Sequence, residues 1–221
     1  MKIWKRFGKL FHNTGVQKAQ SIQQVAIFGF ADSKEEEATF KSAVEVAKRL
    51  AQAGYLVVDG GGPGIMRAAT IGAKQGGGKV IGVTFYPEDM TNFEGRDPRN
   101  PIDEEIKTSS YVERTLTLMK EGQVYVVFNG GTGTLSEFAM AWGLARLYFG
   151  HHKPLILYGK FWNKIINAIK DNMQLRPDDL KVFKIVDSPQ EVLEAIELFE
   201  KEIQAGVHDG HLAATKNGYS V

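Results

Sequence analysis

Residues 123–137 have the sequence Gln-Val-Tyr-Val-Val-Phe-Asn-Gly-Gly-Thr-Gly-Thr-Leu-Ser-Glu. A short apolar run is followed at once by a glycine-rich turn and then by a helical pattern, which is typical of a strand that turns into a helix. Glycine lets the backbone approach a ligand closely, and the free N–H groups at the start of a helix favour an anion. We therefore predict a phosphate site formed by Gly130, Gly131, Thr132, Gly133 and Thr134.

Glu137 closes this run, and we expect it on the first turn of the helix, facing the bound group. A carboxylate there suits a ribose hydroxyl or a developing cation better than a second phosphate. Two structural alternatives stay open. The glycines could serve only to permit a tight turn, and Glu137 could be an exposed residue favoured by the positive end of the helix dipole.

Short apolar runs alternate with helical patterns on both sides of the signature. The expected strands cover residues 25–30, 55–59, 79–85, 105–109, 123–128, 154–158 and 182–186. The expected helices cover residues 33–53, 65–75, 110–120, 134–149, 161–173 and 188–203. This alternation predicts an α/β fold: a doubly wound, mostly parallel sheet in a Rossmann-like, three-layer single domain.

The chain has 221 residues, of which 43% are hydrophobic, enough for one sizeable core. We predict one nucleotide-binding domain at residues 23–204, a basic amphipathic extension at residues 1–22 and a polar tail at residues 205–221. The extension places apolar residues at helical spacing among lysines and an arginine, so it could touch a membrane surface. Docking on the domain or on a second subunit, or an extension without fixed contacts, is the favoured interpretation.

The net charge of +1 provides no basic footprint for a nucleic acid, so a small ligand is the expected partner. No cysteine is present, which excludes disulfides and thiolate chemistry and fits a cytoplasmic setting. No apolar run approaches the roughly 18 residues that span a bilayer, and we expect no membrane partner. His151, His152, His208 and His211 lack metal-site spacing, so we expect no metal.

Parallel sheets bind ligands at the carboxyl ends of their strands. The turns at Gly29, at residues 60–64 and at residues 129–134 all follow expected strands, so they should converge on one crevice. Residues 86–103 are rich in proline and charge, too polar for the core, and are expected to form a loop near the site that could act as a lid.

The run Gly60-Gly61-Gly62-Pro63-Gly64-Ile65-Met66, together with residues 129–137, resembles the paired GGG-x-x-G-[IL]-M and PGG-x-GT-x-x-E signatures of the LOG family. That family consists of nucleoside 5′-monophosphate phosphoribohydrolases that activate cytokinins, and it is also called lysine decarboxylase-like. The resemblance covers residues 25–199, with Asn129 in place of the usual proline.

The resemblance implies catalytic roles for Glu137 and for Arg114, which matches the arginine of the family's M-x-x-R-K pattern. Arg114 would contact the substrate, by a two-pronged grip on phosphate or by orienting the carboxylate; the alternative is a solvated arginine that pairs with Glu113 or with a residue one helical turn away. Gly29, Asp59, Gly61, Gly62, Gly64 and Met66 would form the rest of the nucleotide pocket, with Met66 near the base or in the core. Phe30 and Thr115 depart from the family pattern, which leaves the choice of base open.

We therefore expect a hydrolase that cleaves the N-glycosidic bond of a nucleoside 5′-monophosphate, needs no cofactor and forms a homodimer through its site helices. The apolar flank Phe138, Met140, Ala141, Trp142 and Leu144 suits that interface or packing on the sheet. The alternatives are a non-catalytic nucleotide or molybdenum-cofactor carrier and a nucleotide sensor. A pyridoxal-phosphate decarboxylase and a Rossmann dehydrogenase are disfavoured, because no lysine lies in a recognisable constellation and no G-x-G-x-x-G follows the first strand.

Overall fold

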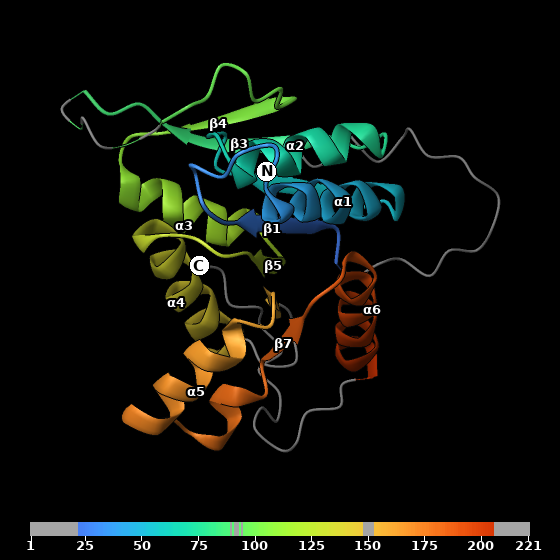
Figure 1. Ribbon diagram of the computed structural model, residues 1–221, viewed down its shortest axis with the longest axis vertical. Coiled ribbons are helices and arrows are strands. Elements are labelled where there is room, and N and C mark those ends of the chain that lie inside the picture. The colour runs from blue at the N-terminus through green and yellow to red at the C-terminus, as the bar shows by residue number, and fades with distance from the viewer. Residues whose placement is uncertain (1–21, 89, 91–92, 94, 148–152, 206–221) are drawn as a thin grey trace.

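The computed structural model describes residues 22–88, 90, 93, 95–147 and 153–205 (Figure 1). Within these residues seven strands form one sheet, in the order β4-β3-β2-β1-β5-β6-β7, and all neighbours are parallel. The strands are β1 (Gln24–Phe28), β2 (Leu56–Asp59), β3 (Val80–Phe85), β4 (Glu104–Thr108), β5 (Val124–Val127), β6 (Leu155–Tyr158) and β7 (Phe183–Val186). The predicted parallel α/β fold is confirmed. Residues 1–21 and 206–221, which include almost all of the predicted extension and tail, lie outside the described residues.

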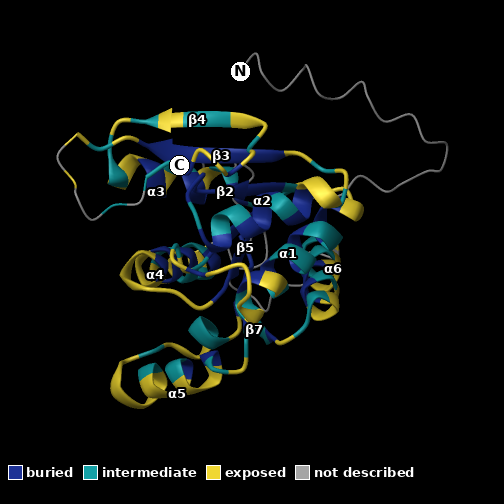
Figure 2. Ribbon diagram, turned by 45° about the horizontal axis from the view of Figure 1, so that its top comes forward, coloured by how far each residue is buried: buried dark blue, intermediate teal, exposed yellow. Residues whose placement is uncertain are grey.

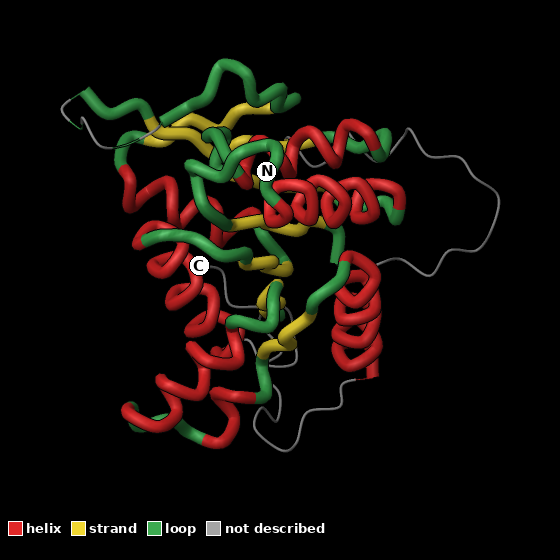
Figure 3. Tube along the Cα trace, viewed as in Figure 1, coloured by secondary structure: helices red, strands yellow, loops and turns green. Residues whose placement is uncertain are grey.

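Helices cover both faces of the sheet, so the molecule has three layers (Figure 3). One face carries α1 (Ala38–Gln52), α2 (Ile65–Gln75) and α6 (Pro189–Ala205), and the other carries α3 (Tyr111–Glu121), α4 (Thr132–Leu147) and α5 (Trp162–Asn172). Each face has its own apolar cluster. The inner strands β3 and β5 are buried along their whole length because neither side faces water, which is why their residues are mostly apolar (Figure 2).

The direction of winding reverses beside β1, and this reversal creates the ligand crevice. The chain proceeds from β1 through β2 and β3 to the edge strand β4, then returns to place β5 on the other side of β1. The turns after β1 and β5 therefore lie next to each other. The N–H of Phe30 in the first turn donates to the carbonyl of Asn129 in the second at 3.0 Å.

Two helix starts differ from the sequence prediction by two residues or more. The first helix was predicted to begin at Ser33, but α1 begins at Ala38, and the Ser33 hydroxyl donates to the Glu37 carboxylate at 2.8 Å. The site helix α4 begins at Thr132, two residues earlier than predicted, so Glu137 lies on its second turn and not on its first. A short 3-10 helix, η1 (Pro177–Leu180), was not predicted; the Trp142 indole N–H donates to its Asp179 carbonyl at 2.6 Å.

The loop that follows β3, residues 86–103, is anchored to the turn at residues 60–64. The prediction that this loop is too polar for the core is wrong at two positions. Asp97 and Asn100 are buried. The Asp97 N–H donates to the Gly61 carbonyl at 3.0 Å, and the Asn100 amide donates to the Gly62 carbonyl at 2.9 Å. These bonds pair the buried Asp97 N–H and Asn100 amide with acceptors, whereas the Asn100 side-chain oxygen has no partner among the described residues.

No helix in the described part of the chain combines the length and the apolar character that crossing a bilayer requires. The same residues contain no group of three or more His, Asp or Glu side chains that could hold a metal ion. His151, His152, His208 and His211 lie outside the described residues.

Candidate functional site

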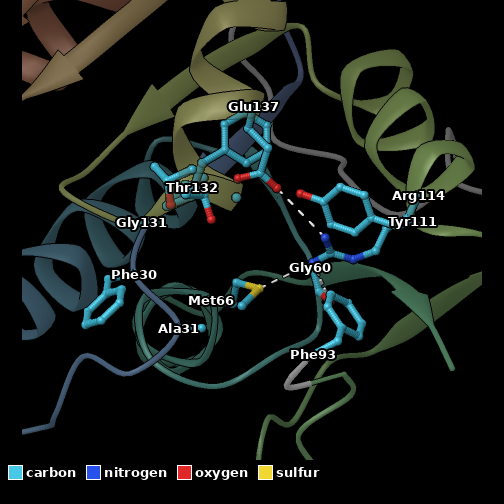
Figure 4. A pocket seen from close by; sticks show the side chains of 15 residues that line it. Phe30, Ala31, Gly60, Met66, Phe93, Tyr111, Arg114, Gly131, Thr132 and Glu137 are labelled. Carbon is cyan, nitrogen blue, oxygen red and sulfur yellow. Dashed lines mark hydrogen bonds and ion pairs between the residues drawn. The ribbon is translucent and has the colours of Figure 1, made fainter. Parts of the chain in front are cut away.

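A cavity of about 340 Å³ opens at the carboxyl ends of β1, β2 and β5 (Figure 4). Three turns that are distant in sequence meet there, as the parallel sheet predicts. The predicted site residues that line the cavity are Gly29, Met66, Arg114, Gly131, Thr132, Gly133, Thr134 and Glu137. The other predicted site residues, Gly61, Gly62, Gly64 and Gly130, are not part of its lining.

The first turn of α4 presents unpaired backbone donors to the cavity. The first helical hydrogen bond runs from the Leu135 N–H to the Gly131 carbonyl at 2.9 Å. The N–H groups of Thr132, Gly133 and Thr134 precede that bond and have no acceptor within the helix. Together with the positive end of the helix dipole, these three donors form a place where an anion is stabilised.

Gly130 shapes this turn without lining the cavity. A Cβ atom at Gly130 would lie only 2.1 Å from the Thr134 hydroxyl oxygen, so a larger residue would displace that side chain. The glycine requirement is therefore steric at this position.

Glu137 lies on the second turn of α4, buried, with its carboxylate directed toward Arg114 (Figure 4). Burial raises the pKa of Glu137 to about 7, and the nearby Arg114 charge acts in the opposite direction. Oε1 of Glu137 is 3.8 Å from Nη1 of Arg114, too far for a hydrogen bond. The pair is therefore electrostatic and leaves the carboxylate oxygens available to a ligand.

Arg114 is held by the backbone of two strand ends. Its Nε donates to the Val83 carbonyl at 3.0 Å and its Nη2 to the Gly60 carbonyl at 3.1 Å. The alternative of a solvated arginine is wrong, because the side chain is buried and Glu113 instead bonds to Ser109. The Nε proton and one Nη2 proton bond to backbone carbonyls, and the Met66 sulfur lies 3.5 Å from Nη2, so the two protons of Nη1 are the donors left for Glu137 and a ligand oxygen.

Gly60 is required by Arg114, a relation that the sequence did not indicate. A Cβ atom on Gly60 would lie 1.6 Å from Nη2 of Arg114. Only a glycine leaves room for the guanidinium at this point.

The residues next to Gly60 stabilise the turn at residues 60–64 without lining the cavity. The fully buried Asp59 carboxylate accepts from the Gly61 N–H and the Thr70 hydroxyl, both at 2.7 Å, and burial raises the pKa of Asp59 to about 6. Asp59 thus does not line the pocket, contrary to expectation. Gly64 has φ +61, and a Cβ there would lie 2.3 Å from the Phe30 carbonyl oxygen, so it allows the turns after β1 and β2 to touch.

Besides Phe28 at the end of β1, two aromatic residues of the cavity were missed by the sequence analysis: Phe93 of the anchored loop and Tyr111 at the start of α3. Their rings meet edge to face, with centroids 5.9 Å apart. Tyr111 could have been found, because it precedes Arg114 by three residues and therefore shares its helix face. Phe93 had no such signal, since nothing in a loop sequence specifies which residue turns inward.

Met66 lines the cavity, and its sulfur is 3.5 Å from Nη2 of Arg114. It therefore contributes to the pocket surface and is not confined to the core.

Comparisons with known proteins place the chain in a family. The model of the SLOG cluster4 family (LDcluster4) matches residues 22–190. A cytokinin riboside 5′-monophosphate phosphoribohydrolase of Mycobacterium tuberculosis (strain ATCC 25618 / H37Rv) is 30% identical over 163 residues, which cover 69% of this chain and 82% of the relative. A probable enzyme of the same name from Oryza sativa subsp. japonica is 23% identical over 187 residues, covering 80% and 72%.

The fold also resembles solved structures. The molybdenum cofactor binding protein from Rippkaea orientalis superposes with a TM-score of 0.58 at 24% identity, covering 80% of this chain and 95% of that one. The match concerns the fold alone. The family model and the enzyme relatives agree with the resemblance found in the glycine signatures, and the chain belongs to the SLOG cluster4 family, which is LOG-like.

Proposed function

We propose that this protein hydrolyses the N-glycosidic bond of a nucleoside 5′-monophosphate, releasing the free base and ribose 5-phosphate. The observation that carries the proposal is the buried Glu137 carboxylate, which lies in the same cavity as the unpaired donors of α4 and beside a fixed arginine. The relatives named as phosphoribohydrolases support the reaction class.

The phosphate would bind at the N-terminus of α4. The N–H groups of Thr132, Gly133 and Thr134 can donate to its oxygens, and the helix dipole favours its charge. A ribose attached to that phosphate would extend along α4 toward its second turn, where Glu137 lies.

Glu137 would stabilise the charge that develops as the bond breaks. Loss of the base leaves positive charge on the ribose ring, and a carboxylate in a low-dielectric site stabilises that charge strongly. The Arg114 charge opposes the effect of burial and helps to keep Glu137 ionised. Water supplies the oxygen that bonds to C1′, and the base leaves with a proton on its nitrogen, so no cofactor is required.

We expect the reaction to depend on an ionised Glu137. Because burial raises the pKa of Glu137 to about 7, the fraction of active carboxylate falls as the pH drops below that value. The kcat/KM for base release should therefore decrease by about tenfold per pH unit on the acid side. The substrate phosphate also titrates near this range, so an NMR titration of the free protein, with Glu137→Gln as the assignment control, measures the group directly. A carboxyl that titrates near 4.5 would contradict this prediction.

The proposed activity is tested by incubating the protein with AMP, GMP, CMP, UMP and a cytokinin riboside monophosphate and following free base by chromatography. Release of base supports the hydrolase and ranks its substrates. Tight binding of a nucleotide that stays intact would instead favour the carrier. Phe30, Thr115 and Asn129 differ from the LOG family pattern, which is the reason for testing that alternative. Failure to bind any of these nucleotides would reject both.

We further propose that two copies of the chain associate through α3 and α4. The flank considered in the sequence analysis packs on the sheet: Phe138 and Ala141 are buried, and Met140, Trp142 and Leu144 pack partly buried around them. The opposite side of α4 bears a stripe of exposed apolar or small residues at every fourth position, Leu135, Ala139, Gly143 and Leu147. On α3, Val112 and Leu116 are likewise exposed.

A charge on this stripe should prevent association. Leu147 is 72% exposed, so Leu147→Glu costs little in the folded monomer yet places a charge in the proposed contact. Sedimentation velocity should show a dimer for the natural protein and a monomer for the variant. Leu198→Glu on α6, an exposed leucine of the other layer, is the matched control. A monomeric natural protein would reject the dimer.

A further inference from the structure

Tyr111 lines the cavity and contacts both helices that border it, α3 and α4. It is the first residue of α3, and its N-cap Ser110 accepts a hydrogen bond from the N–H of Glu113, which fixes the start of that helix. Its ring packs edge to face on Phe93 and lines the cavity. Its hydroxyl lies 3.3 Å from the Ser136 hydroxyl on α4.

The direction of the Tyr111–Ser136 hydrogen bond follows from a second contact. The Ser136 hydroxyl is 2.8 Å from the Gly133 carbonyl, and a carbonyl can only accept, so Ser136 is the donor there. A serine has one hydroxyl proton, which this bond uses. Tyr111 must therefore donate to Ser136, and its oxygen is left with lone pairs and no free proton.

The Glu137 carboxylate forms a second acceptor on the same side of the cavity. Figure 4 shows the Tyr111 hydroxyl pointing toward the Glu137 carboxylate, which comes down from α4. An ionised carboxylate only accepts hydrogen bonds. Tyr111 and Glu137 thus present acceptors from two helices to the same cavity, and a ligand that satisfies both must offer two donors.

We propose that the Tyr111 oxygen accepts a hydrogen bond from one hydroxyl of the ribose 2′,3′-diol, beside the ribose contact already expected of Glu137, and that Tyr111 thereby makes the site selective for ribonucleotides over deoxyribonucleotides. This inference rests on the proposed function, because it assumes that a nucleoside monophosphate occupies the cavity. A ribose diol supplies two O–H donors on adjacent carbons, which match the two acceptors.

The other parts of a nucleotide fit these acceptors less well. A phosphate would face the lone pairs of Tyr111 and the charge of Glu137, whereas the unpaired N–H groups of Thr132, Gly133 and Thr134 offer it donors. Tyr111 also stands three residues before Arg114, where the M-x-x-R-K pattern has methionine. The hydroxyl is therefore a feature of this chain that the general pattern does not contain.

The test compares AMP, 2′-deoxy-AMP and 3′-deoxy-AMP with the natural protein and with Tyr111→Phe. Tyr111→Phe keeps the ring that packs on Phe93 and removes only the hydroxyl. We expect the natural protein to prefer AMP over each deoxy compound by about 10- to 100-fold in kcat/KM, because each missing hydroxyl leaves an acceptor unsatisfied. In Tyr111→Phe the kcat/KM for AMP should fall by about tenfold. The kcat/KM for the one deoxy compound that lacks the hydroxyl contacted by Tyr111 should equal that of the natural protein for the same compound.

Tyr86→Phe is the matched control. The Tyr86 hydroxyl donates to Glu105 at 2.6 Å, outside the cavity lining, so its removal should leave the preference for AMP over each of the two deoxy compounds unchanged. Ser136→Ala is a second variant. It removes the acceptor that holds the Tyr111 proton, and the preference for AMP should fall with it, whereas Ser136→Thr retains a hydroxyl and should preserve the preference.

Equal losses on all three nucleotides in Tyr111→Phe would overturn the inference and assign Tyr111 a structural role. A natural protein with the same kcat/KM for AMP and for the deoxy compounds would overturn it as well. So would a Tyr111→Phe variant in which the ratio of kcat/KM for AMP to that for IMP differs from the natural protein, because that result would place Tyr111 against the base. If base is not released, calorimetric binding of the same three nucleotides tests the diol contact separately from catalysis. Absence of both release and binding would reject the proposed function itself.

Discussion

Glu137→Gln should reduce base release by on the order of a thousandfold, because the neutral amide cannot stabilise positive charge on the ribose ring. Glutamine has nearly the same shape, so the cavity and the binding of the phosphate at α4 should persist. The expected result is a variant that binds AMP with an affinity close to that of the natural protein yet releases adenine barely above background. Chromatography of free base and calorimetric binding measure the two effects.

The stability of the same variant distinguishes catalysis from misfolding. The pKa of Glu137 is raised in the folded state, from 4.5 to about 7, so the ionised carboxylate destabilises the fold above pH 7 and has no such effect below about 4.5. Glu137→Gln removes that penalty, and its melting temperature relative to the natural protein should be higher at pH 8 than at pH 5. Glu113→Gln, an exposed residue on α3, is the control for both assays. Full activity in Glu137→Gln would refute the catalytic role.

Substitution of Arg114 should affect activity and stability together. In Arg114→Met the carbonyls of Val83 and Gly60 lose their donors, and a buried unsatisfied acceptor costs about 1–3 kcal/mol. For a chain of this length that cost lowers the melting temperature by several degrees. Arg114→Lys should recover only part of the loss, because one ammonium cannot reach both carbonyls and Glu137 with the spacing of a guanidinium.

Activity in the Arg114 variants should fall by about a hundredfold or more, since the carboxylate loses the charge that favours its ionised form. The acid limb of the pH profile should also move toward higher pH in Arg114→Met, an effect that a purely structural arginine would not produce. Arg99→Met provides the control, because Arg99 pairs with Asp97 on the loop and is not part of the cavity lining. A pH profile that is unchanged in Arg114→Met would contradict the proposal that the Arg114 charge favours the ionised form of Glu137.

Local patterns in the sequence were sufficient to predict the sheet and the position of the anion turn. Apolar runs such as residues 123–128 have no polar alternation, which indicates a strand covered on both faces. The glycines at 130, 131 and 133 indicate a close backbone approach wherever the chain lies. These signals depend on neighbours in sequence, so they hold without knowledge of the rest of the fold.

The residues at which helices begin were harder to predict from the sequence, because several residues can serve as the first helical position. Ser33 has the side chain of a capping residue, yet its hydroxyl bonds to Glu37 and α1 begins later. The helix α4 begins two residues earlier than the glycines suggested. Glu137 therefore lies on its second helical turn, but it still lines the cavity. An error of two residues therefore changed the expected geometry of the site but not its members.

Sequence patterns predicted the parallel α/β architecture and the crevice at the strand ends, and together with the family resemblance they pointed to Glu137 and Arg114, which do line the cavity. How Arg114 is held, why residue 60 is glycine, and that Phe93 and Tyr111 complete the cavity became visible only in the folded chain. The reason is physical: a strand or a glycine turn follows from interactions between residues close in sequence, whereas the partners of a buried guanidinium or a phenol hydroxyl are set by chain segments that meet only when the sheet has formed.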